Sequence, residues 1–77
     1  MDRINTIHDV EPGSVIEYVG SKRTFKVKRY GLHAIIIEIF PSSDARTRTI
    51  VKIMHVGNGE LRFVRDVQLF ARWRKCV

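Results

Sequence analysis

The chain is poor in cysteine: among its 77 residues only Cys76, close to the C-terminus, carries a thiol. One cysteine cannot form a disulfide within the chain, and zinc sites that use two or four cysteines are excluded. The scarcity of cysteine fits a protein of the reducing cytosol. We therefore expect a cytoplasmic protein in which Cys76 is an incidental thiol near a frayed terminus.

Long apolar runs are also absent. The longest, AIIIEIF at residues 34–40, is interrupted by Glu38 and is far shorter than the roughly 20 apolar residues of a membrane span. The N-terminal sequence MDRINTIHDV has an acid at position 2 and no apolar run, unlike a secretory signal peptide. These absences predict a soluble protein without a membrane partner.

Recognisable catalytic signatures are missing as well. The chain has no glycine-rich phosphate loop, no Gly-x-Ser-x-Gly sequence and no paired-carboxylate motif. The sequence places no nucleophile or carboxylate beside His33 or His55, and the group His8, Asp9 and Glu11 lacks an accepted metal-ligand spacing. We therefore predict a protein that is not an enzyme, with no catalytic residues, no metal site and no cofactor.

Acidic residues are scarce relative to basic ones. Lys and Arg number 14 and Asp and Glu number 8, so the formal net charge is +6 and the sequence pI is about 10.1. No acid occurs between Glu17 and Glu38. A pI above roughly 9 is typical of nucleic-acid-binding domains, and an excess of positive charge also suits an acidic protein partner. The charge therefore predicts a negatively charged partner.

What the chain does contain is short runs of Val, Ile, Phe, Tyr and Thr between closely spaced turn residues. This pattern is typical of an all-β barrel or sandwich. We expect one domain over residues 1–77, a small SH3-like barrel of five or six short antiparallel strands. An OB-like barrel and a β-sheet with a short C-terminal helix are the alternatives. The first five strands are expected near residues 15–19, 24–30, 34–40, 47–56 and 60–64.

The two ends of the chain allow more than one assignment. Residues 1–12 form either a loose N-terminal arm or a short helix. In residues 66–77 an alternating and a helical pattern overlap, and we favour a short 3₁₀ turn that leads into a last strand. Trp73 in this segment is expected to close the core, with an exposed binding anchor as the alternative.

The dipeptide Asn58-Gly59 predicts a two-residue type I′ hairpin turn, because both of its positions tolerate positive φ. That turn would place Met54 opposite Phe63 and Ile53 opposite Val64. Both faces of this hairpin then carry apolar residues. Either a strongly curved barrel buries some of them on each side, or one face meets a partner.

A four-residue loop at 20–23 would pair the first two expected strands so that their large apolar side chains face one another. This register makes the following pairs: Ile16 with Val27, Glu17 with Lys26, and Tyr18 with Phe25. It predicts that Phe25 and Val27 lie in the core, while Lys26 has a carboxylate opposite it.

Three groups of residues are predicted to bind nucleic acid. Phosphate neutralisation by Lys and Arg supplies most non-specific affinity for nucleic acid, and an aromatic side chain can add base stacking. The residues are Lys22, Arg23, Lys26, Lys28 and Tyr30 in the expected first hairpin, Arg46 and Arg48 in the following polar loop, and Arg72 and Arg74 near the C-terminus. The alternative is that each group is only a solvated strand surface or edge.

The segment VEPGSVIEYVGSKRTFKV, residues 10–27, resembles the opening of SH3-like barrels of the KOW/Tudor type. The residues that carry the resemblance are Gly13 before the first expected strand, Val15 in it, Gly20 in the turn, and Phe25 and Val27 in the second strand. The further glycine of the KOW pattern is missing. The resemblance implies an SH3-like fold and binding to nucleic acid or to the transcription machinery.

These observations lead to one leading function and one alternative. The leading function is a small basic protein that binds nucleic acid, DNA rather than RNA, through the phosphate backbone; it would be nucleoid-associated. The alternative is a protein-binding adaptor or inhibitor, for example a phage or accessory protein, with an acidic partner. Its apolar patch would consist of Val51, Ile53 and Val64. A homodimer built through exposed strands is compatible with either function.

Overall fold

The computed structural model describes residues 2–20, 31–41 and 49–76. The prediction of an all-β fold of short antiparallel strands is confirmed, and the expected strand at 24–30 lies outside the described residues. The elements are β1 (Asp2–Arg3), the 3₁₀ helix η1 (Ile7–Asp9), β2 (Val15–Tyr18), β3 (His33–Phe40), β4 (Ile50–His55), β5 (Leu61–Arg65), α2 (Asp66–Arg72) and β6 (Trp73–Lys75).

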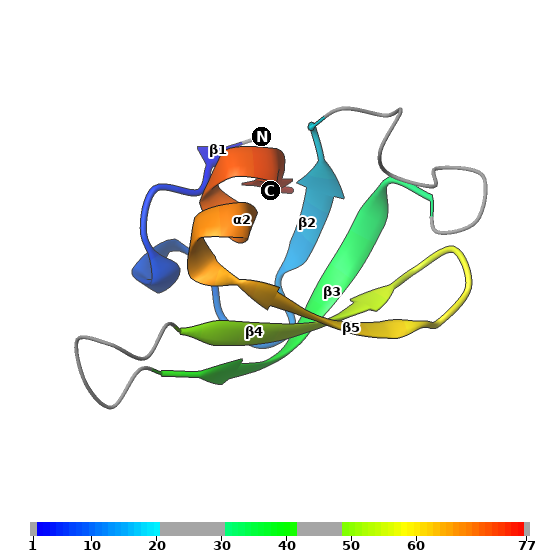
Figure 1. The fold of residues 1–77 in the computed structure, drawn as a ribbon. Coiled ribbons are helices and arrows are strands. Elements are labelled where there is room, and N and C mark those ends of the chain that lie inside the picture. Colours follow the sequence, from blue (N-terminus) through cyan, green and yellow to red (C-terminus); the bar gives the residue numbers. More distant parts are fainter. Residues whose placement is uncertain (1, 21–30, 42–48, 77) are drawn as a thin grey trace.

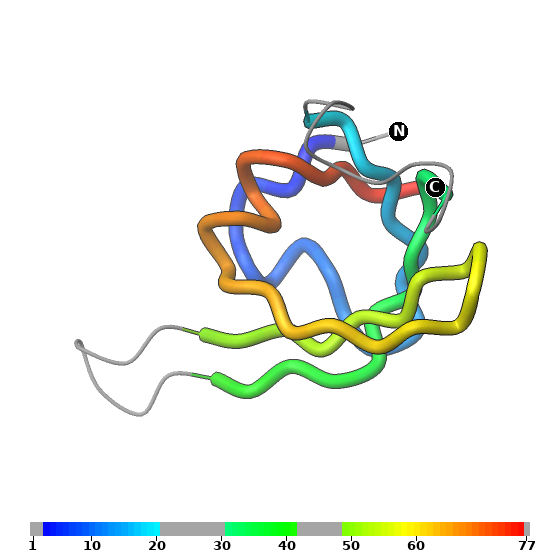
Figure 2. Tube along the Cα trace, turned by 45° about the vertical axis from the view of Figure 1, so that its right-hand side comes forward, coloured from blue at the N-terminus to red at the C-terminus, as the bar shows by residue number. Residues whose placement is uncertain are grey.

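All six strands belong to one sheet in the order β1-β6-β2-β3-β4-β5, and the pairs are antiparallel. The sheet curls around the core, and α2 lies across its concave side (Figures 1 and 2). Within the described residues the two edge strands, β1 and β5, are not paired with each other, so the sheet is not closed. The relationship to SH3-like barrels of the KOW/Tudor type stays a prediction.

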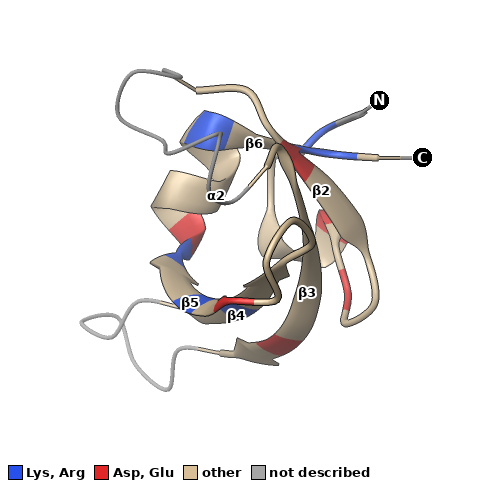
Figure 3. Cartoon of the chain, turned by 90° about the vertical axis from the view of Figure 1, so that its right-hand side faces the viewer, with Lys and Arg blue, Asp and Glu red and all other residues tan. Residues whose placement is uncertain are grey.

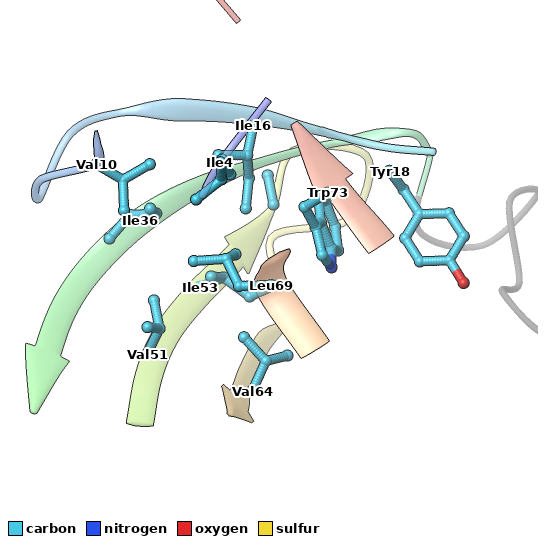
Figure 4. Close-up of a cluster of buried hydrophobic side chains, with 11 residues drawn as sticks. Ile4, Val10, Ile16, Tyr18, Ile36, Val51, Ile53, Val64, Leu69 and Trp73 are labelled. Carbon is cyan, nitrogen blue, oxygen red and sulfur yellow. The ribbon is translucent and has the colours of Figure 1, made fainter. Parts of the chain in front are cut away.

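One hydrophobic core fills the curl of the sheet (Figure 4). Its side chains are Ile4, Val10, Ile16, Tyr18, Ala34, Ile36, Val51, Ile53, Val64, Leu69 and Trp73. Burial alternates along β4, as expected for a strand with one face inward. The predicted apolar partner patch of Val51, Ile53 and Val64 is therefore wrong, because all three side chains are buried in this core.

The N-terminal segment is part of the fold, and the expectation of a loose arm is wrong. Strand β1 pairs with β6, and Ile4 and Val10 are core residues. Between them, the Asp9 carboxylate accepts hydrogen bonds from the backbone N–H of Asn5, at 2.9 Å, and of Thr6, at 3.0 Å. These two bonds lower the pKa of Asp9 and hold the 3₁₀ turn that brings the chain back to the sheet.

The predicted pairing of the first hairpin is wrong. Both edges of β2 are occupied, one by β3 and the other by β6. Glu17 therefore has His33 and Arg74 as its cross-strand neighbours rather than Lys26. Tyr18 faces Trp73, and their rings meet edge to face with centroids 5.2 Å apart. Burial of this aromatic pair gives β2 and β6 a register that no local pattern could reveal.

The β4–β5 hairpin forms as expected, but its turn and register differ from the prediction. The loop has four residues, 56–59, closed by the backbone N–H of His55 donating to the Glu60 carbonyl at 2.8 Å. Within this loop only Gly59 has positive φ, 73°, while the Asn58 side-chain oxygen accepts from the Glu60 N–H at 2.9 Å. Met54 thus faces Leu61. Because the shift is two residues, each side chain keeps its face of the sheet.

At the C-terminal end, a seven-residue α-helix replaces the expected 3₁₀ turn, and the expected last strand follows it. The side chain of Gln68 caps the helix by accepting from the Arg65 N–H at 3.1 Å. The helix buries Leu69, and β6 buries Trp73, which confirms the core assignment of the tryptophan. Within the described parts of the chain, no helix is long and apolar enough to cross a membrane.

Candidate nucleic-acid interface

Most residues predicted to bind nucleic acid fall outside the described part of the chain. They are Lys22, Arg23, Lys26, Lys28, Tyr30, Arg46 and Arg48. The other two are described: Arg72 is the exposed last residue of α2, and Arg74 is a half-buried residue of β6. This C-terminal pair and its neighbours are the described part of the predicted binding surface.

The surplus positive charge of the chain is concentrated in two segments. The described residues contain seven Lys and Arg and seven Asp and Glu, so their formal charges cancel. Figure 3 shows both signs distributed over the described elements. The whole net charge of +6 therefore comes from residues 21–30 and 42–48. The surfaces nearest to this positive charge are those beside the points at which the two segments join the fold.

The two segments join the fold at different places. Gly20, which precedes residues 21–30, packs so closely on Tyr18 and Arg72 that an added Cβ would lie 2.8 Å from Tyr18 Oη and 3.3 Å from Arg72 Cβ. Pro41, which precedes residues 42–48, follows the C-terminal end of β3, whereas Gly31 lies just before its N-terminal end. An eight-residue strand separates these ends by about 25 Å. The attachment points of segments 21–30 and 42–48 are thus not adjacent.

A pocket lies beside Gly20, between α2, β6 and β1. Its volume is about 380 Å³, and it is lined by Arg3, Val19, Phe70, Ala71, Trp73 and Arg74. The chain is anchored at its rim because the Val19 N–H donates to the Arg72 carbonyl at 2.7 Å. The described chain that precedes segment 21–30, which carries most of the surplus charge, therefore ends at the edge of this pocket.

Two arginines of the pocket lining are neighbours on adjacent strands. Arg3 on β1 and Arg74 on β6 are direct cross-strand partners. Among the described side chains, neither guanidinium has a carboxylate within 4.0 Å, and the Glu17 carboxylate beside Arg74 lies instead 3.8 Å from His33 Nε2. Arginine stays protonated at any ordinary pH, and like charges directly opposite each other destabilise a sheet. An anion between the two guanidinium groups would remove that repulsion.

The aromatic side chains beside the arginines give the pocket an apolar wall. Phe70 is half-buried and packs against the core, while Trp73 is almost fully buried. The ring of His55 lies behind Trp73, with centroids 6.1 Å apart. Burial, and secondarily the positive charge of Arg62, lowers the pKa of His55, so this imidazole is neutral at physiological pH and belongs to the core rather than to the pocket.

A second exposed feature lies on the outer, convex face of the sheet. One row of cross-strand neighbours runs through Val15, Ile35, Met54 and Leu61. The ring of Phe63, 63% exposed, lies next to it beside Phe40, with centroids 6.2 Å apart. We call these six residues the outer apolar face. Within this face, Val15, Leu61, Phe40 and Phe63 are exposed, and Ile35 and Met54 are half-buried.

Sequence reasoning missed Arg3, Val19 and Phe70 as site residues. Arg3 lies in the segment expected to be a loose arm, and no local pattern links it to a residue 71 positions later. The only available signal was that arginines occur near both ends of the chain. Pairing of the terminal strands brings them together (Figure 3).

Comparison of the chain with protein-family models, with curated proteins and with solved structures finds no match.

Proposed function

We propose that this protein binds nucleic acid, DNA in the first instance, by contacting the phosphate backbone without reading base sequence. The observation that carries the proposal is the Arg3–Arg74 pair, which lines a pocket with an aromatic wall and has no carboxylate within ion-pairing distance among the described side chains. The basic segment 21–30 starts at the rim of this pocket, so its charge can add to the same contact.

The chemistry of the pocket suits a phosphodiester. A guanidinium group can donate two parallel hydrogen bonds to phosphate oxygens, and two neighbouring groups can hold one phosphate or two successive ones. Phe70 in the wall offers an apolar surface for a sugar or a base next to that phosphate. Lys22, Arg23 and Lys28 would supply further phosphate contacts, and Tyr30 a stacking group.

The proposal is tested by fluorescence anisotropy with a labelled DNA duplex over a range of salt concentrations. The double variant Arg3→Gln/Arg74→Gln removes the pocket charges, and Lys52→Gln/Arg65→Gln removes the same number of charges from β4 and β5. The logarithm of the binding constant falls linearly with that of the salt concentration, and each lost phosphate contact lowers the slope by about 1. We expect a slope lower by about 2 in the pocket variant and little change in the control variant.

Two results would contradict the proposal in different ways. Absence of salt-dependent binding by the unaltered protein at low salt, to duplex and to single-stranded DNA and RNA alike, would refute nucleic-acid binding itself. If the salt slope fell equally in the pocket and control variants, nucleic-acid binding would stand and the role of the pocket would be refuted. A Lys22→Gln/Arg23→Gln variant measures the contribution of segment 21–30 in the same assay.

The outer apolar face supports a second candidate function, binding to an acidic protein. Leu61 and Phe63 are more than half exposed, and Lys52 Nζ lies 6.0 Å from the centre of the Phe63 ring. An apolar centre with a cationic neighbour suits a protein surface of apolar and acidic residues.

The two candidate functions make opposite predictions for two variants. In a pull-down from nuclease-treated lysate, a specific protein partner should be lost with Leu61→Ser/Phe63→Ser and kept with Arg3→Gln/Arg74→Gln. Loss of the partner only in the arginine variant would refute the apolar contact. Light scattering at two protein concentrations reports whether that partner is a second copy of the chain.

A further inference from the structure

We propose that Glu17, His33 and Cys76 form a zinc-binding site on the outer face of the sheet. Glu17 lies on β2, His33 begins β3, and Cys76 follows β6. The three residues are far apart in the sequence, and the β6-β2-β3 order of the sheet brings them together. Each supplies a different donor atom, namely a carboxylate oxygen, an imidazole nitrogen and a thiol sulfur.

The donor atoms are already close to the spacing that a zinc ion needs. All three lie within 4.8 Å of one another, and Glu17 Oε2 is 3.8 Å from His33 Nε2. A zinc ion about 2.0–2.3 Å from each ligand holds the ligand atoms of a tetrahedral site about 3.3–3.8 Å apart. Closing the site therefore requires side-chain adjustments of about 1 Å and no movement of the strands.

Backbone hydrogen bonds hold the three strands in place around this cluster. The Cys76 N–H donates to the Val15 carbonyl at 2.8 Å, so the cysteine continues the β6 pairing and is not part of a frayed end. On the other edge of β2, the Tyr18 N–H donates to the Leu32 carbonyl at 2.7 Å, next to the Glu17–His33 pair. The ligand-bearing backbone is thus organised before a metal arrives, which reduces the entropy cost of binding.

The donor set favours zinc over the lighter divalent ions. Thiolate and imidazole ligands suit Zn²⁺, whereas Mg²⁺ and Ca²⁺ prefer sites built of oxygen. One thiolate and one carboxylate neutralise the charge of the ion, which matters because Arg74 is the cross-strand neighbour of Glu17. The cluster is accessible: the side chains of His33 and Glu17 are 50% and 22% exposed. Three protein ligands leave a fourth position for water or for a group from a partner.

The site is tested with Co²⁺, which replaces zinc in tetrahedral sites and gives a thiolate-to-metal absorption band. The assay uses the full chain without a histidine tag, in the presence of a non-thiol reductant. Because Cys76 is the only cysteine, any such band must come from it. We expect the band to saturate at one Co²⁺ per chain, to disappear when Zn²⁺ is added, and to be absent in Cys76→Ser.

Two further variants and one control assign the other ligands. His33→Gln and Glu17→Gln should each weaken metal binding by at least about tenfold. His8→Gln, which changes an exposed histidine outside the cluster, should bind as the unaltered protein does. Far-ultraviolet circular dichroism checks folding, and if one of the two variants is unfolded the other decides.

Several outcomes would overturn the proposal. The first two are that the unaltered protein gives no absorption band, or that the band saturates at one metal per two chains. The other two are that a folded His33→Gln or Glu17→Gln variant binds metal with unchanged affinity, or that His8→Gln loses metal binding. Nucleic-acid binding is measured independently and does not enter this result.

Discussion

Replacement of Ile53 by alanine tests which face of the β4–β5 hairpin is the core. Ile53 is completely buried, and it lies among core residues of β4, β5 and α2 (Figure 4). The change removes three carbon atoms from the core, about 2.4 kcal/mol of transfer free energy at about 0.8 kcal/mol each, and leaves a cavity. We expect the free energy of unfolding to fall by about 3–4 kcal/mol. The whole free energy of unfolding of a domain of this size is roughly 4–11 kcal/mol, so the variant should be close to unfolding.

The assay is urea unfolding followed by the fluorescence of Trp73, the only tryptophan, which is buried near Tyr18 and His55. Phe63→Ala is the matched control, because it removes a larger side chain from the exposed outer face of β5. That change should cost less than about 1 kcal/mol. If Phe63→Ala destabilised the protein more than Ile53→Ala did, the assignment of inner and outer faces would be wrong.

Two further predictions concern His55 and Gly20. Burial lowers the pKa of His55 below 6.5 in the folded protein, so the unfolded chain binds a proton first as the pH falls. The contribution of His55 to the free energy of unfolding should therefore be complete above about pH 6.5 and decline below it. This decline should be smaller in His55→Gln than in a His8→Gln control. Urea unfolding between about pH 5 and 8 measures this, and an equal decline in both variants would contradict it. Gly20→Ala should lower the melting temperature, because its Cβ would lie 2.8 Å from Tyr18 Oη; differential scanning calorimetry that detected no change would show that Tyr18 can move aside at little cost.

Elements with a strong local signal were predicted well. The expected strand at 34–40 matches β3, His33–Phe40, because its run of β-branched residues favours a pleated, half-buried strand. The strand at 60–64 matches β5 to within one residue. The α2 helix had been only the alternative to the favoured 3₁₀ turn, since a segment of seven residues is stabilised mainly by burying Leu69 against the sheet.

Strand pairing was predicted poorly, because it depends on contacts between distant parts of the chain. An expected local hairpin competes with every other strand that can bury the same side chains. Here β6 takes one edge of β2, where Tyr18 and Trp73 pack their rings edge to face. The turn at 56–59 shows the same limit on a smaller scale, since Asn58 is used as a hydrogen-bond acceptor and not in the left-handed conformation.

In the candidate sites, too, local sequence signals were predicted and contacts between distant residues were not. Net charge predicted a negatively charged partner, and the assignment of Lys22, Arg23, Lys28, Arg46 and Arg48 to phosphate contacts remains a prediction, because these residues lie outside the described part of the chain. Arg74 was chosen as a member of the C-terminal basic cluster, and the pocket it lines depends on pairing with Arg3. The cluster of Glu17, His33 and Cys76 had no sequence signal, since its residues are not spaced as any local metal motif requires.

The amino-acid sequence alone determined that this protein is a small all-β domain with a large excess of positive charge. Those properties are sums over residues or follow from the period-two alternation of single strands, so no long-range contact is needed to read them. Tertiary structure decided that β6 enters the sheet between β1 and β2, and with it the Arg3–Arg74 pocket and the grouping of Cys76 with Glu17 and His33. The physical reason is that burial of Ile4, Leu69 and Trp73 in one core draws both ends of the chain onto the same sheet.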